Sequence, residues 1–214
     1  QSAQGMGEFD FAIHPIGGIV PVMERHLYKD YAKIMLASIP YLPSNRPVHM
    51  FGCGHPMLFP MSIALGADLF DSAAYALFAR DGRLLTPWGT QKIATMVEWP
   101  ERMPCVAHLT PAEVREMEKK DKIALLARYN LEVTLAELDR CKQAIRDGTL
   151  WRLTERRSHQ HPALREAFLW LSTNPHNKKL DLQFLEDLVL DDRDAARDRD
   201  TNAGKWEHAW NWIV

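Results

Sequence analysis

The fold is decided by residues 46–72, which read RPVHMFGCGHPMLFPMSIALGADLFDS. Two short apolar runs, at residues 48–51 and 67–70, have the length and composition typical of buried parallel strands. Pro56 is well placed to begin a helix between them, and Gly66 is well placed to end it. The stretch therefore predicts a strand, a helix and a second strand that runs parallel to the first.

The residues before this stretch follow the same order. Residues 9–16 predict another short strand, and we expect an amphipathic helix from Pro21 to about Ile39. Three parallel strands are too few for a closed barrel of about 250 residues, and they leave open sheet edges. The sequence thus predicts an α/β fold that forms the C-terminal part of a (β/α)8 TIM barrel. Upstream sequence or a partner chain is expected to supply the missing strands.

The chain becomes helical after about residue 100. Thr110 and Glu113 form a capping box, and a long helical pattern follows until Gly148. His161 and Pro162 open another helix. We expect three regions: βα units of the barrel at residues 1–100, a helical region at 101–155, and a helical tail at 156–214 with an acidic and basic linker at 191–200.

The composition argues against several classes of protein. The chain has 214 residues, of which 46% are hydrophobic and 25% charged, and its formal net charge is −2. These values are typical of a globular domain rather than a disordered chain, a coiled-coil rod or a strongly basic nucleic-acid coat. The apolar runs are too short to span a membrane. Cys53, Cys105 and Cys141 suggest no disulfide framework, so we expect a reducing, cytoplasmic compartment. A start at Gln1 indicates an internal fragment or a processed piece.

Asp71 is the leading candidate for chemistry. It follows the third predicted strand, at the end of the strand where barrel enzymes carry their active sites. A carboxylate there can act as a base, a metal ligand or a nucleophile towards an anomeric carbon. The alternative is structural, because Asp is a favoured N-cap and a helix is expected to follow.

The ends of the other two strands carry further candidates. Gly17 and Gly18, and later Gly52 and Gly54, would let a ligand approach the backbone closely, or would simply allow tight turns. Phe51 would stack on a base, or would serve as an ordinary core aromatic.

Three weaker patterns allow a metal or phosphate site. His49, Cys53 and His55 alternate, although no fourth ligand is evident. Cys105 and His108 form a similar pair. A set of basic residues would contact phosphate groups or only keep the helices in solution: Lys119, Lys120, Lys122, Arg152, Arg156 and Arg157.

Taken together, these motifs resemble the archaeal-type tRNA-guanine transglycosylases, within the archaeosine/queuine tRNA-ribosyltransferase family. The resemblance covers roughly residues 10–170, and the order and spacing of the motifs are more specific than any one of them. The matching segments lie at residues 16–21, 46–56, 65–77, 85–90, 110–111, 125–131 and 148–153.

The resemblance implies a reaction and the residues that perform it. The family exchanges a guanine in tRNA for a 7-deazaguanine, which in the archaeal branch is 7-cyano-7-deazaguanine. Asp71 matches the family's nucleophile, which implies a pentosyltransferase with a covalent ribosyl-Asp intermediate. Gly17, Gly18 and Ile19 match the loop that lines the base pocket. Phe51 matches the residue that packs against the base.

The chain departs from the family's pattern in three places. The upstream strands are absent, with the family's general acid/base Asp, so the chain alone is expected to be an incomplete enzyme. The zinc motif, C-x-C-x-x-C after a Pro and then a His, is lost: Pro100 precedes only Cys105, and Tyr129 stands at the His position. No cofactor is therefore predicted, and we expect packing to replace the zinc or the region to be looser. Residues 175–214 match no known part of the family.

Three functional hypotheses follow. The first is a tRNA-guanine transglycosylase, whose partners would be tRNA, a 7-deazaguanine base, the missing barrel half and, in a homo- or hetero-oligomer, further chains. The second is a non-catalytic, zinc-less binding subunit of such an enzyme, and the third is a DNA-acting 7-deazaguanine transglycosylase. The presence of Asp71 and both glycine turns favours catalysis, whereas the lost zinc motif favours the binding subunit.

Overall fold

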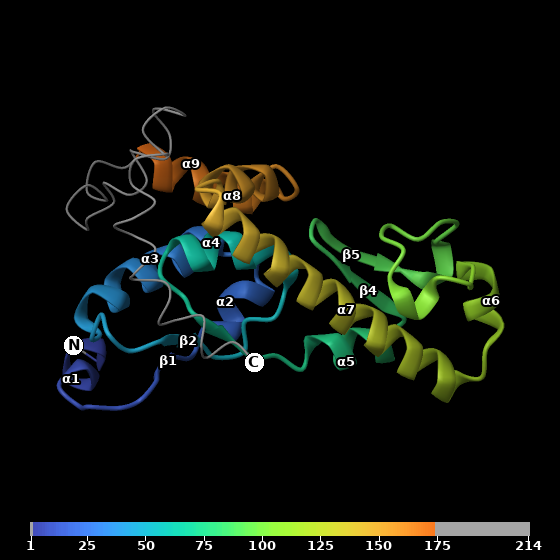
Figure 1. Cartoon of the computed structure of the whole chain (residues 1–214), viewed down its shortest axis with the longest axis horizontal. Helices are drawn as coiled ribbons and strands as arrows, with labels where there is room; N and C mark the ends of the chain where they lie inside the picture. The colour runs from blue at the N-terminus through green and yellow to red at the C-terminus, as the bar shows by residue number, and fades with distance from the viewer. Residues whose placement is uncertain (1, 174–214) are drawn as a thin grey trace. The chain divides into compact units, whose positions relative to one another are not determined.

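A computed structural model describes residues 2–173 of the chain (Figure 1). These residues form two compact units. Unit 1 contains residues 2–53, 60–71 and 141–173, and unit 2 contains residues 54–59 and 72–140. The expected linker at 191–200 lies outside the described residues, and the three regions predicted from the sequence stay a prediction.

Unit 1 is built on a parallel three-stranded sheet with the order β1-β2-β3. Its strands are β1 (His14–Ile16), β2 (Val48–Met50) and β3 (Leu69–Phe70). Along the sheet, Met50 pairs with Ile16 on one side and with Phe70 on the other. The predicted parallel sheet is confirmed, but the first strand is shorter than expected because residues 9–13 are exposed and bury no face.

The other elements of unit 1 are helical. They are α1 (Ser2–Gly7), α2 (Val20–Glu24), α3 (Tyr28–Ser38), the 3-10 turn η1 (Ile39–Tyr41), α4 (Phe59–Ala64), α8 (Leu150–Ser158) and α9 (Pro162–Thr173). α9 packs against α3 and α8, as Figure 1 shows. The single helix predicted from Pro21 to Ile39 is wrong: His26 has a φ of 55°, a left-handed conformation that ends α2 before α3 begins. The single helix expected from Pro56 to Leu65 starts instead as a 3-10 turn at residues 56–58, and its α-helical part, α4, ends at Ala64, two residues before Gly66 with its φ of 103°.

Unit 2 is mostly helical and contains one antiparallel hairpin. Its elements are η2 (Pro56–Leu58), α5 (Ala74–Arg80), β4 (Arg83–Thr86), β5 (Gly89–Lys92), η3 (Ile93–Thr95), η4 (Pro104–Val106), α6 (Pro111–Glu116) and most of α7 (Lys119–Arg146). The capping box of Thr110 and Glu113 is confirmed. The helical pattern beyond it is divided in two, because Met117 adopts extended backbone and ends α6 before α7 starts.

The core of unit 2 lies between α7, the hairpin and the segment from residue 93 to residue 114. Its buried members are Ala79, Leu84, Ile93, Met96, Trp99, Met103, Val106, Val114, Leu126, Tyr129 and Val133. Asn130 is fully buried beside them and bonds three backbone groups of α5 and β4. No helix between residues 2 and 173 is long and apolar enough to cross a membrane.

Candidate active site

The parallel sheet of unit 1 determines where Asp71 lies. Asp71 directly follows β3, so it stands at the carboxyl end of the strand, as the sequence predicts. His49 pairs with Leu69 in the register of β2 and β3. Because side chains alternate along a strand, Leu69 and Asp71 share a face with His49. A two-residue offset along that face separates His49 from Asp71.

Two hydrogen-bond donors meet at one oxygen of Asp71. The backbone N–H of Gly52 donates to Asp71 Oδ1 at 2.9 Å, and His49 Nε2 also lies 2.9 Å from Oδ1. The side chain of Asp71 is 50% exposed, whereas that of His49 is 20% exposed. The carboxylate is thus held through Oδ1 while half of the side chain remains exposed to solvent.

The alternative reading of Asp71 as a helix cap is wrong. The next helix, α5, starts three residues later, and its N-cap position is Ala73. The Oγ atom of Ser72, not the carboxylate, accepts a hydrogen bond from the N–H of Ala74 at 3.0 Å. Asp71 therefore has no part in starting the helix and is available for chemistry.

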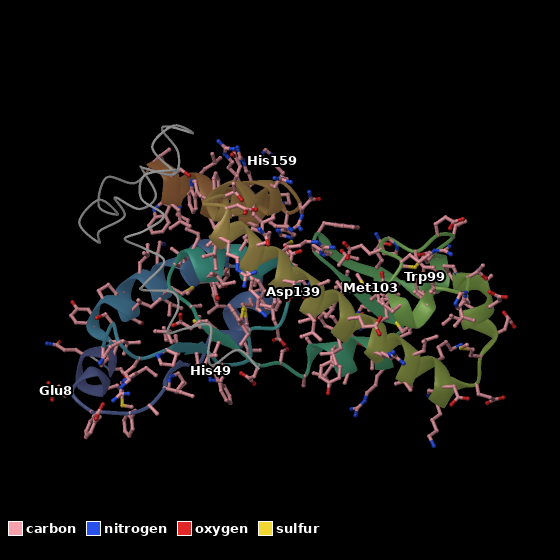
Figure 2. The ribbon with its side chains drawn as sticks, viewed as in Figure 1. Glu8, His49, Trp99, Met103, Asp139 and His159 are labelled. Atoms are coloured by element: carbon pink, nitrogen blue, oxygen red, sulfur yellow. The ribbon has the colours of Figure 1, made fainter. Side chains whose placement is uncertain are left out.

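Phe51 lies beside His49 and is not a core residue. It follows β2 directly and is 56% exposed. Its ring meets the ring of His49 edge to face, with the centroids 5.7 Å apart. His49, labelled in Figure 2, thus contacts both Phe51 and Asp71, a role that the sequence did not indicate. The residue that holds the carboxylate therefore also contacts an exposed aromatic ring.

The loop after β1 places two of its three candidate residues at the surface. Gly17 and Gly18 are exposed, and Gly18 has a φ of 73°, which a side chain would disfavour. Ile19 is fully buried and precedes α2. The roles of Gly17, Gly18 and Ile19 in a base pocket stay predictions.

His49, Cys53 and His55 do not form the metal site that their spacing allowed. Cys53 is fully buried, lies 3.6 Å from the hydroxyl of Tyr31, and has its pKa raised to about 11 by burial. His55 Nδ1 accepts a hydrogen bond from the N–H of Met57. Among residues 2–173, no three His, Cys, Asp or Glu side chains are close enough together to hold a metal ion.

The region that carries zinc in the resembling family is held by other contacts here. Tyr129 donates from its hydroxyl to the carbonyl of Glu101 at 2.9 Å, and its ring stacks on Trp99. Burial and the nearby Glu132 carboxylate raise the pKa of the Cys105 thiol to about 12. A lone cysteine and a hydrogen-bonded tyrosine do not fit a zinc site.

The basic candidates belong to two elements. Lys119, Lys120 and Lys122 lie on α7, in unit 2, and Lys122 Nζ donates to the carbonyl of Arg115 at 2.6 Å. Three arginines lie on α8, in unit 1: Arg152, Arg156 and Arg157. Their contact with phosphate groups stays a prediction.

Comparison with known proteins identifies the family. A family model described as "Queuine tRNA-ribosyltransferase" matches residues 1–163. The chain is 50% identical over 171 residues to the tRNA-guanine(15) transglycosylase of Methanocaldococcus jannaschii, an alignment that covers 78% of this chain and 26% of that protein. The protein of the same name from Thermococcus onnurineus is 48% identical over 167 residues, which cover 78% of this chain and 29% of that protein.

The chain therefore spans a little over a quarter of the length of these relatives. The matched residues include both glycine turns, Phe51 and Asp71. The expected resemblance is confirmed by the family match and by these identities, and the chain belongs to the queuine tRNA-ribosyltransferase family.

Proposed function

We propose that this chain is the nucleophile-bearing part of a tRNA-guanine transglycosylase. The observation that carries the proposal is the half-exposed carboxylate of Asp71, at the carboxyl end of β3, in contact with His49, whose ring meets the exposed ring of Phe51. The names of the relatives support guanine in tRNA as the substrate. A 7-deazaguanine, with 7-cyano-7-deazaguanine as the first candidate, would be the incoming base.

The reaction would proceed through two displacements at C1′ of the ribose. In the first, an oxygen of Asp71 bonds to C1′ while the C1′–N9 bond breaks, and guanine leaves with the electron pair and takes up a proton from a general acid. In the second, N9 of the deazaguanine gives its proton to the same group, now a general base, and bonds to C1′ while the ester C1′–O bond breaks and releases the carboxylate. Two inversions give retention and a covalent ribosyl-Asp intermediate.

The architecture proposed for the whole site is a (β/α)8 barrel, of which unit 1 supplies the last strands. Its support is the parallel order β1-β2-β3, with short apolar strands typical of barrels. The partners would then be tRNA, the base, and a missing barrel half on upstream sequence or another chain of an oligomer. The three free cysteines favour a reducing compartment such as the cytoplasm.

The test is exchange of labelled guanine into tRNA by the protein encoded by the complete reading frame. Asp71→Asn is expected to lower the rate by about 1000-fold or more, because the amide cannot form the ribosyl ester. Asp68→Asn is the matched control: its side chain accepts a hydrogen bond from the N–H of Val48, and Asn retains an acceptor. A stable analogue of the incoming base can trap the covalent ester between the protein and tRNA as a gel band. Loss of that band in Asp71→Asn would assign the nucleophile.

A second function is a zinc-less binding subunit, and the contacts of Tyr129 and Cys105 favour it. The exchange assay, combined with a measurement of tRNA binding, separates the enzyme from the binding subunit. A binding subunit binds tRNA, while wild type and Asp71→Asn are equally inactive in exchange. Duplex DNA as acceptor provides a third arm. Exchange into DNA and not tRNA would favour the DNA-acting alternative.

A further inference from the structure

His49 was a metal candidate in the sequence, yet its ring contacts Asp71. The parallel register of β2 and β3 places both side chains on one face of the sheet, two residues apart along the strands. An imidazole is long enough to cover this offset, and the result is the 2.9 Å separation of Nε2 and Oδ1. The register of β2 and β3 therefore fixes His49 and Asp71 relative to each other.

The two donors leave the two oxygens of Asp71 unequal. An ionised carboxylate only accepts hydrogen bonds, so His49 Nε2 and the Gly52 N–H both donate to Oδ1. Oδ2 accepts no hydrogen bond from any residue between 2 and 173. Oδ1 is therefore anchored by two hydrogen bonds, Oδ2 has none from these residues, and the side chain as a whole is half exposed.

We propose that His49 is a positioning residue for the nucleophile, and that Asp71 attacks with Oδ2. The inference rests on the proposed transglycosylase function. His49 and Gly52 fix the rotation of the carboxylate through Oδ1, so Oδ2 is already aimed when the ribose arrives. Oδ2 bonds to C1′ while the C1′–N9 bond breaks, and guanine leaves with the electron pair and a proton from a general acid. The negative charge that remains on Oδ1 disappears as the ester forms.

Phe51 ties this arrangement to the base. Its ring lies edge to face with the ring of His49, which also contacts the carboxylate of Asp71. A variant must therefore separate the loss of the donor from the loss of the ring. His49→Gln retains an N–H donor without a ring, and His49→Phe retains a ring without a donor.

The experiment measures kcat and KM for guanine exchange in both variants, with wild type and Asp71→Asn alongside. Loss of one hydrogen bond to a charged, reacting group should lower kcat of His49→Phe by about 10- to 100-fold, while KM changes by less than about 3-fold. His49→Gln should recover most of kcat. A purely structural role would lower both variants alike, or would raise KM.

Two results would overturn the inference. One is a His49→Phe enzyme as fast as wild type; the other is an equal loss of kcat in both variants while their melting temperatures stay unchanged. Inactive wild-type protein would instead reject the proposed function, and with it this role of His49. The two kinds of failure are distinguishable, because only failure of the proposed function leaves the wild-type protein without exchange.

Nitrogen-15 NMR of labelled histidine tests the contact without activity. The His49 ring, assigned by its loss in His49→Gln, should carry hydrogen on Nε2, and its signal should shift in Asp71→Ala. The exposed His159, labelled in Figure 2, is the reference that should stay unchanged. A bare Nε2 with hydrogen only on Nδ1 would overturn the inference, because that tautomer cannot donate to Oδ1.

Discussion

The phenol ring of Tyr129 stacks on the indole of Trp99, with the ring centroids 5.3 Å apart. The hydroxyl of Tyr129 donates to the carbonyl of Glu101, and Trp99 Nε1 donates to the carbonyl of Leu109 at 2.6 Å. These contacts fasten the segment before α6 to the long helix α7. Within unit 2 they connect the same segments that a metal would connect in the resembling family.

The first prediction is that this region is stable without zinc. A chelator such as EDTA should change the melting temperature by less than about 1 °C, because no metal has to be removed. Tyr129→Phe should lower the free energy of unfolding by about 1 kcal/mol, because the carbonyl of Glu101 loses its donor. Calorimetry with and without chelator measures both. A drop in melting temperature on chelation that Cys105→Ser abolishes would contradict the prediction.

A second prediction concerns Asn130 on α7. Its Oδ1 accepts from the N–H of Leu85 at 2.7 Å, and its Nδ2 donates to the carbonyls of Tyr75 and Arg83. Asn130→Leu has similar volume but removes three hydrogen bonds to backbone groups in a buried site, so it should cost about 2 to 4 kcal/mol of unfolding free energy. Urea unfolding followed by circular dichroism measures the loss.

Leu135→Ala on the same helix is the control for Asn130. Leu135 is 52% exposed, so truncation there should cost less than about 1 kcal/mol. Equal losses for the two variants would show that α7 is sensitive to any substitution, and that the three hydrogen bonds of Asn130 are not its anchor.

Local signals in the sequence predicted much of unit 1. Apolar runs located two of the three strands, the first strand was predicted too long, and proline and glycine marked the starts and ends of helices, because these preferences act within a few residues. The break at His26 was missed, since nothing in the side chain of a histidine requires a left-handed backbone. The hairpin β4–β5 was missed because β5 is polar and mostly exposed, so backbone pairing and not an apolar pattern defines it.

The candidate site was also predicted only in part from the sequence. Asp71 could be found because its position after a strand is visible in the sequence. The partner His49 could not, because the contact depends on the register between two strands that are about twenty residues apart in the chain. The cap alternative for Asp71 failed for a related reason: the helix after it starts at Ala74, and helix boundaries are weakly encoded.

A third prediction is that alanine substitution has different effects at Gly52 and Gly17, two glycines that follow neighbouring strands. Gly52 has a φ of 84°, and an added Cβ would come within 2.6 Å of Val20 Cγ2. Gly52→Ala should therefore destabilise the protein by about 1 to 3 kcal/mol. It should also lower the rate of guanine exchange, because the N–H of Gly52 holds Asp71. Thermal unfolding and the exchange assay measure the two effects.

Gly17→Ala is the matched control for Gly52→Ala. An added Cβ at Gly17 meets no atom within 4 Å, so the unfolding free energy should change by less than about 0.5 kcal/mol. If Gly17 lines the base pocket, this variant should raise KM for guanine at unchanged stability. A stability loss equal to that of Gly52→Ala would contradict the steric argument at Gly52.

The fourth prediction is a pH dependence at the start of α9. Burial and the nearby charge of His26 lower the pKa of His161 from its usual 6.5, and the two ring centroids are 4.5 Å apart. The folded protein then binds this proton less tightly than the unfolded chain. The stabilisation is fully present above the unfolded pKa and is lost as the pH falls through it towards the folded pKa.

His161→Asn tests that dependence without removing the helix start. His161 Nδ1 accepts from the N–H of Ala163, and the Asn side chain can accept in its place. The fall in melting temperature from about pH 7.5 to about pH 5.5 should shrink in His161→Asn, because one group that binds protons more tightly in the unfolded chain is gone. His159→Asn, at an exposed position two residues earlier, should leave the fall unchanged. An identical pH profile for wild type and His161→Asn would show that the His26–His161 pair does not couple protonation to folding.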